Sequence, residues 1–139
     1  SKFDSSGSFS WARTWGGFSF DTGYGVAGDD SGNIYVTGRF WDIVDFDPGG
    51  EIDERTSAGG YDAFVSKFDM TGAYQWADTW GGTSSEEGNG ITLFGSLNFY
   101  VVGDFGDSVD FDPSLSEDFH VSNGSTDVFL SKFKLDGTW

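Results

Sequence analysis

The chain lacks cysteine altogether and has one histidine, one methionine and two prolines among its 139 residues. The absence of cysteine excludes disulfides, thiolate zinc sites and cysteine nucleophiles together. No run of about 18 apolar residues is present, so the sequence predicts no segment that inserts into a membrane. Any core must therefore be stabilised by packing between parts of the chain.

Basic residues are also scarce, since 7 Lys and Arg stand against 23 Asp and Glu and give a formal net charge of −16. Nucleic acid is not expected as a partner, because phosphate binding needs clustered Lys and Arg. Anionic membrane surfaces should repel the chain, whereas divalent cations are suitable counter-ions. The aromatic content of 19% argues against a disordered chain despite the 22 glycines.

What the chain does contain is a tandem repeat without gaps. Ser1–Asp4 recurs as Ser66–Asp69, an offset of 65 residues, and Ser131–Phe133 begins a third copy. Further matches are Trp11-Ala12 with Trp76-Ala77, Thr14–Gly17 with Thr79–Gly82, and Val44–Pro48 with Val109–Pro113. We predict a first repeat over residues 1–65, a second over 66–130 and the start of a third over 131–139.

Each repeat is expected to contain a small antiparallel sheet. Runs of β-branched and aromatic residues bounded by glycine predict strands over 62–68, 73–80, 90–94 and 99–103, the last two forming a hairpin. Extended segments over 105–113 and 119–122 follow. Several strands carry large apolar side chains on both faces, so we expect sheets that pack face to face. The predicted fold class is all-β, with tandem four-stranded antiparallel propeller-like blades.

The order of these motifs resembles the bacterial SBBP-type β-propeller repeat over essentially the whole chain. The residues that carry the likeness are Asp62–Asp69, Gly72–Trp76, Gly81-Gly82, Gly23–Val26 and Gly32–Gly38. The resemblance implies four-stranded blades in extracellular or cell-surface bacterial proteins, and it supplies no catalytic residues. The chain departs from the family at Gly95–Asn98, where the family has Ser-Gly-Asn, and in the Val-Asp-Phe-Asp-Pro segment of each copy, which weakens the expectation of a compact closed ring.

Two acidic pairs recur within that segment, Asp45 with Asp47 and Asp110 with Asp112. Alternation along a strand turns both carboxylates of a pair to one side. They would bind calcium there if carbonyls and waters completed about six to eight oxygen ligands. The alternative is a solvated edge ended by a proline, which protects the strand from mispairing. Further acids at the same offset that could contribute are Asp42, Asp53, Asp107 and Asp118.

No enzymatic activity is predicted. His120 is the single histidine and has Arg55 as its equivalent, so we expect it at the surface and not in a triad or zinc site. No serine stands in a Gly-x-Ser-x-Gly elbow. Paired carboxylates also serve glycoside hydrolysis. Acids that repeat in both copies are nevertheless expected to belong to the scaffold, since an active site is normally unique.

The tryptophans divide into repeated and unrepeated positions. The repeated ones are expected in the core between sheets: Trp11, Trp15, Trp76 and Trp80. Trp41 stands where the second copy has Gly106, so we expect it to be exposed as a contact residue. Asn123 opens an Asn-Gly-Ser sequon and is the candidate glycosylation site.

The sequence favours an extracellular structural or adhesive repeat protein. Residues 1–4 begin inside a strand, and residues 127–133 supply a complete strand at the other end, so strand edges are expected to pair with copies of the chain or with adjacent repeats of a longer one. A ring, a fibre and a longer chain all satisfy this expectation. The alternative is a lectin-like or protein-binding propeller module with a carbohydrate or protein ligand, and a glycoside hydrolase fragment is the least favoured function.

Overall fold

The computed structural model describes residues 1–114 and 116–139, which form β-strands and no helix. The strands of the first half are β1 (Lys2–Phe3), β2 (Phe9–Trp11), β3 (Gly16–Gly17), β4 (Thr22–Gly28), β5 (Ile34–Phe40), β6 (Ile43–Asp45) and β7 (Glu54–Thr56). Those of the second half are β8 (Asp62–Phe68), β9 (Tyr74–Trp80), β10 (Glu87–Phe94), β11 (Asn98–Asp110) and β12 (Phe119–Lys134). The predicted all-β class is confirmed, and every strand pair is antiparallel.

The central sheet has four strands in the order β4-β5-β8-β9. Its β4–β5 hairpin turns at Asp29, whose Oδ1 accepts hydrogen bonds from the backbone N–H groups of Ser31 at 3.0 Å and Asn33 at 2.9 Å. Gly32 takes a positive φ of 82° in this turn, a conformation that glycine adopts without steric cost. The same turn follows β8, where Asp69 accepts from Thr71 and Ala73. Local turn chemistry thus fixes both reversals.

A second sheet follows in the order β10-β11-β12. The segments expected over 105–113 and 119–122 do not stand apart from it, because β11 continues to Asp110 and β12 begins at Phe119. The register shifts between Gly106 and Ser108, and Asp107 has a φ of 54° at this bulge. Its equivalent Asp42, with a φ of 68°, lies between β5 and β6. One backbone irregularity therefore recurs in both copies.

Two small sheets complete the structure. One pairs β1 with β2, and the other has the order β3-β6-β7. Residues of β1 and β2 lie 65 positions before residues of β8 and β9, so they correspond to the last two strands of a four-stranded sheet. The predicted repeat boundaries at 65/66 and 130/131 fall inside β8 and β12, so the central sheet takes strands from both sequence copies.

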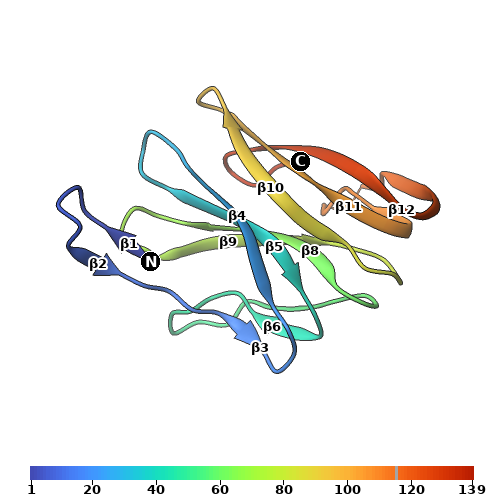
Figure 1. The fold of residues 1–139 in the computed structure, drawn as a ribbon, viewed down its shortest axis with the longest axis horizontal. Coiled ribbons are helices and arrows are strands. Elements are labelled where there is room, and N and C mark those ends of the chain that lie inside the picture. The colour runs from blue at the N-terminus through green and yellow to red at the C-terminus, as the bar shows by residue number, and fades with distance from the viewer. Residues whose placement is uncertain (115) are drawn as a thin grey trace.

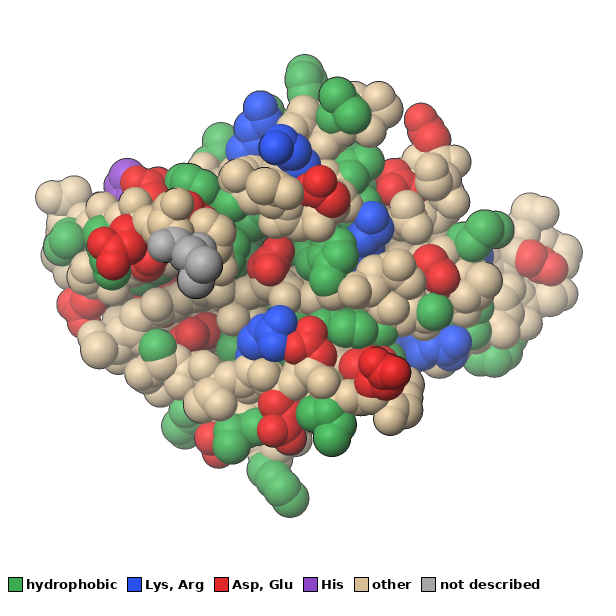
Figure 2. All heavy atoms as spheres, turned by 180° about the vertical axis from the view of Figure 1, so that it is seen from behind, with side chains coloured by type: hydrophobic (Ala, Val, Ile, Leu, Met, Phe, Trp, Pro, Cys, Tyr) green, Lys and Arg blue, Asp and Glu red, His purple; other side chains and the backbone are tan. Residues whose placement is uncertain are grey.

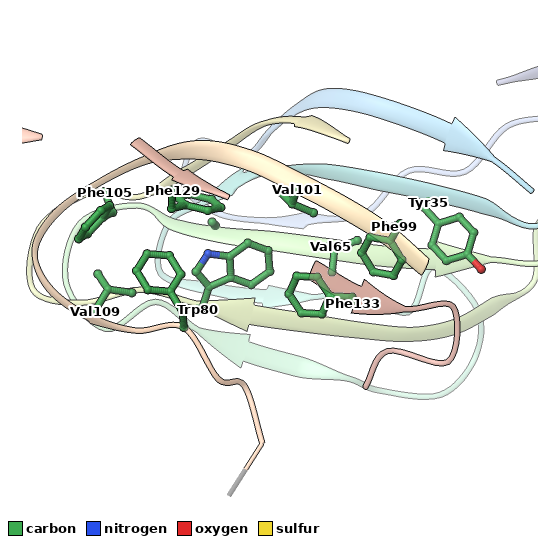
Figure 3. Close-up of a cluster of buried hydrophobic side chains, with 11 residues drawn as sticks. Tyr35, Val65, Trp80, Phe99, Val101, Phe105, Val109, Phe129 and Phe133 are labelled. Carbon is green, nitrogen blue, oxygen red and sulfur yellow. The ribbon is translucent and has the colours of Figure 1, made fainter. Parts of the chain in front are cut away.

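The central sheet carries an apolar cluster on each face. One face packs against the β10-β11-β12 sheet through a cluster that includes Tyr35, Val65, Trp80, Phe99 and Phe133. Figure 3 shows the rings of Trp80, Phe133, Phe99 and Tyr35 beside one another between the two sheets. The other face carries a second cluster of Phe40, Val44, Phe46, Phe64 and Ala77. In Figure 1 the described sheets follow one another across the molecule without closing into a ring.

Candidate functional site

The packing between sheets is itself repeated. The Trp80 ring lies 5.4 Å from the Phe133 ring across the two large sheets. The Trp15 ring lies 4.9 Å from the Phe68 ring on the opposite face of the central sheet. These pairs differ by 65 positions at both residues. The segment that contains Trp15 therefore packs on the central sheet in the way that the segment of Trp80 packs on the next sheet.

A lysine contact repeats in the same manner. The Nζ of Lys67 donates a hydrogen bond to the carbonyl oxygen of Leu135 at 2.8 Å. The Nζ of Lys2 donates to the carbonyl oxygen of Met70 at 3.0 Å. Because aromatic and polar contacts recur together, the stacking geometry is a property of the repeat and not of one junction.

The outer face of the β10-β11-β12 sheet has no such cover among the described residues. Val102, Val128 and Leu130 are 42%, 76% and 69% exposed. Val102 and Leu130 are directly paired across β11 and β12, so they share this face. The equivalent residues of the central sheet are fully buried: Thr37, Ala63 and Val65. The chain thus exposes on its last sheet the apolar face that it buries on its central sheet.

The opposite end of the stack has a hollow of about 340 Å³. Val26, Ile34 and Val36 line it together with Trp15 and Phe68. The second-copy equivalents of Ile34 and Val36 are Phe99 and Val101, and both are fully buried against the central sheet. This hollow therefore lies where a preceding sheet would pack. We define the exposed side of β11 and β12 as the C-terminal face and the hollowed side of the central sheet as the N-terminal face.

The predicted acidic pairs serve as backbone acceptors. Asp45 Oδ1 accepts from the backbone N–H groups of Asp47 and Asp53, both at 3.0 Å. In the second copy, Asp110 Oδ1 accepts from the backbone N–H groups of Asp112 at 3.1 Å and Asp118 at 2.8 Å. The segment after each Val-Asp-Phe motif is thereby folded around one carboxylate.

Calcium binding at these pairs stays a prediction. Within residues 1–114 and 116–139, no three or more acidic or histidine side chains gather as a metal site. Asp47 Oδ1 and Asp112 Oδ1 each accept a further backbone N–H, from Gly49 and Ser114. One oxygen of each of the four carboxylates therefore holds its own loop.

Two acids that link the sheets were missed from the sequence. Glu86 is fully buried, and its carboxylate accepts from the backbone N–H groups of Gly82 at 2.7 Å and Gly106 at 3.3 Å. Burial raises the pKa of Glu86. Asp21 makes the equivalent bonds to Gly17 at 2.8 Å and Trp41 at 3.3 Å. The sequence did contain a signal for them, because both copies have an acidic residue at this position, Asp21 in the first and Glu86 in the second.

A further buried acid lies close to Glu86. Asp62 is the first residue of β8, and its carboxylate accepts a hydrogen bond from the backbone N–H of Ala58. Burial, opposed by that hydrogen bond and reinforced by the charge of Glu86, raises the pKa of Asp62 to about 6. Burial likewise raises the pKa of Asp78 to about 6.

The repeated tryptophans all lie against the sheets, but to different degrees. Trp80 is buried, whereas Trp11, Trp15 and Trp76 are half-buried. Trp41, expected to be exposed, is 44% exposed, with its ring 5.6 Å from that of Tyr61.

The other unrepeated residues are on the surface. His120 is exposed, and its Nε2 lies 3.3 Å from Asp118 Oδ1. Asn123 is also exposed, and its side-chain amide donates to Asp127 Oδ2 at 3.1 Å. The structure brings none of these residues into contact with Trp41 among the interactions that it describes, so they do not form one site.

Acidic side chains are spread over the surface, and Figure 2 shows them interspersed with apolar groups and only a few Lys and Arg side chains on the face in view. Among the described residues there is no helix that could cross a membrane.

Comparison with known proteins relates the chain to a bacterial protein. The chain is 30% identical over 141 aligned positions to the protein described as regulatory protein FlaEY of Caulobacter vibrioides. The alignment covers 98% of this chain and 14% of that protein, so the chain spans about a seventh of its length. No family model and no solved structure matches the chain.

Proposed function

We propose that the chain is an extracellular structural repeat protein of the SBBP type, whose propeller-like sheets associate face to face with further units. The observation that carries this proposal is the exposure of Val102, Val128 and Leu130, whose equivalents are buried between sheets. An apolar face of this kind marks an interaction site. Because the C-terminal and N-terminal faces differ, the contact is head-to-tail, which builds either a ring or a filament.

The similarity to the Caulobacter vibrioides protein supports a modular role. The matching segment makes up 14% of that protein, which fits a unit that functions within a larger structure. The word regulatory describes that protein as a whole, and we do not extend it to the present chain.

A non-catalytic role is supported by the use of the paired acids. Asp45 and Asp110 each accept two backbone N–H groups within their own loops. A carboxylate held in this way, and repeated in both copies, is suited to maintaining the scaffold. Glycoside hydrolysis would instead need one unique pair of carboxyl groups beside a substrate cleft.

Sedimentation velocity at rising micromolar concentration tests the proposal. We expect the wild-type chain to associate and Leu130→Asp to weaken association by about tenfold or more, because a charge replaces a large apolar side chain in the contact. Ile52→Asp is the control, since it makes the same charge change at an exposed residue away from this face. A folded wild-type chain that stays monomeric throughout would overturn the proposal.

Carbohydrate binding is the second candidate, and a cluster that does not repeat favours it. Trp41 packs on Tyr61, and the Arg39 guanidinium lies 4.0 Å from the centre of the Tyr61 ring. The equivalents of these three residues are Gly106, Thr126 and Asp104. An exposed aromatic ring beside a hydrogen-bond donor is suited to stacking on a sugar. Binding on a glycan array that Trp41→Ala abolishes would support this function, and silence of the wild type would reject it.

A further inference from the structure

The outer edge of β12 is a strand edge without a neighbour in the described part of the chain. The second sheet ends at β12, whereas the corresponding strand β8 of the central sheet has β9 beside it. Six residue pairs join β8 to β9, among them Ser66 with Ala77 and Lys67 with Trp76. An edge of this kind presents free N–H and C=O groups that can pair with another strand.

A hollow of about 350 Å³ follows the β12 edge. Phe111, Phe129 and Ser131 line its inner side, and His120 and Asn123 line its rim. The inner three correspond to Phe46, Phe64 and Ser66 in the central sheet. There the space is filled by β9, and Ala77 packs in one cluster with Phe46 and Phe64. We call the hollow beside β12 the strand slot.

The segment that fits the strand slot occurs in this chain. Residues 11-12 and 14-15 repeat the Trp-Ala and Thr-Trp of β9, and β2 lies within the same segment. In the described structure β2 pairs with β1 alone, through two residue pairs. Ser131–Phe133 of β12 is identical to Ser1–Phe3 of β1, so β2 would meet the same three side chains on β12.

Geometry prevents residues 9–15 from filling the strand slot of their own molecule. β2 and β12 lie on opposite sides of the central sheet in Figure 1. The contacts of Trp15 with Phe68 and of Lys2 with Met70 keep the β1–β2 pair on the face away from β12. A second copy of the chain carries the same segment free of this constraint.

We propose that residues 11–15 of a second copy enter the strand slot as an antiparallel fourth strand of the β10-β11-β12 sheet and displace β1 of that copy. Trp139, the equivalent of Tyr74, lines the slot next to the place of these residues. In the register of β8 with β9, Ser131 pairs with Ala12 and Lys132 with Trp11 of the second copy. The exchange replaces a two-pair contact with a five-pair contact, because Trp139 stands at the place of the sixth. It rests on the proposed face-to-face association, because it places the C-terminal face of one copy over the N-terminal face of the next.

The two faces fit together in the same arrangement. Tyr35 packs 5.2 Å from Phe99 between the sheets of one chain. The equivalent contact between copies brings Tyr100 to Ile34, which lines the hollow of about 340 Å³. Leu130, the equivalent of Val65, would pack in the same space between the two copies. Strand exchange and face contact are thus satisfied by one head-to-tail pose.

Cysteine cross-linking tests the proposed register, and the chain offers a clean background because it has no cysteine. Ala12→Cys and Ser131→Cys protein are mixed under mild oxidation, and we expect a disulfide between the two positions. Paired strand positions have Cα atoms about 5 Å apart, within the range of a disulfide. The control mixture uses Thr14→Cys with Ser131→Cys, where a two-residue offset adds about 6.6 Å along the strand.

The same mixtures are examined by sedimentation under reducing conditions. A cross-link in the first mixture and a several-fold lower yield in the control support strand exchange. Association with equal or absent cross-linking in both mixtures overturns strand exchange and leaves face-to-face association standing, whereas monomers without cross-links overturn both.

Hydrogen exchange of the wild type supplies a second measurement that needs no variant. We expect slower amide exchange in both β12 and residues 11–15 as concentration rises. Unchanged exchange in these two segments of associated protein overturns the proposal.

Discussion

Individual aromatic side chains join the sheets of this protein, and Trp80 makes two of these contacts. Its ring contacts Phe129 at 5.9 Å and Phe133 at 5.4 Å, both in the next sheet. Trp15 occupies the equivalent position but is only half-buried. Two tryptophans at the same repeat position, Trp15 and Trp80, therefore differ in how much of the side chain is buried.

This difference predicts unequal losses of stability. We expect Trp80→Ala to lower the free energy of unfolding by about 3–5 kcal/mol, since it empties a closed interface. Trp15→Ala should cost about 1–2 kcal/mol, because less of its surface is removed from water. Urea unfolding followed by far-ultraviolet circular dichroism measures both. Equal losses would show that the two interfaces are not built as described.

The buried carboxyl group of Asp62 makes the stability of the fold depend on pH. Its pKa is raised by burial from 3.8 to about 6, so the folded chain holds this proton more tightly than the unfolded chain does. Its favourable contribution to stability is therefore present below about pH 4 and is lost as pH rises through about 6. Above that range the buried charge destabilises the fold.

We expect Asp62→Asn to match the wild type near pH 4 and to exceed its stability by about 1–2 kcal/mol at pH 7. Unfolding midpoints across this pH range provide the measurement. Asp30→Asn removes the same charge at an exposed position and controls for the net charge of −16. Parallel pH curves for wild type and Asp62→Asn would contradict the role of burial.

At the scale of elements, the sequence predicted the strands whose limits are set locally. The strand expected over 62–68 is β8, and that over 73–80 is β9 with one residue fewer. The turn between them contains Asp69, which accepts backbone N–H groups of Thr71 and Ala73, a signal that neighbouring residues contain.

Long-range pairing set the limits that the sequence missed. The segments expected over 105–113 and 119–122 become parts of β11 and β12, because Gly106 pairs with Thr126 and Ser108 with Val121 across the two strands. Glu86 stands in a polar segment that resembles a solvated loop, but the closing of two sheets buries it. Neither outcome depends on neighbours in sequence, so local patterns could not predict it.

The loop after each Val-Asp-Phe motif is the element that best tests the role of the paired acids. We expect Asp45→Ala to lower the free energy of unfolding by about 1–3 kcal/mol, because the backbone N–H groups of Asp47 and Asp53 lose their acceptor. Asp45→Asn keeps an oxygen acceptor and should cost less.

Melting curves with and without chelator separate this role from calcium binding. A structural acceptor alone gives a midpoint that chelator does not change. A midpoint that falls with chelator in the wild type and not in Asp45→Asn would instead assign calcium to the pair.

At the scale of the whole molecule, the stack of sheets is open at both ends within the described residues. The C-terminal face exposes apolar side chains, and the N-terminal face has the hollow where their equivalents pack inside the chain. Successive sheets are related by one repeated set of contacts, so a further unit can add without any new type of interaction. The central claim is that these two faces meet.

Small-angle X-ray scattering over a series of micromolar concentrations tests that claim most directly, since it reports particle mass and longest dimension together. The account predicts masses that rise in steps of the 15.1 kDa chain, with a dimension that grows for a filament or reaches a limit for a ring. Particles of 15.1 kDa at every concentration, from a chain shown to be folded, would contradict it.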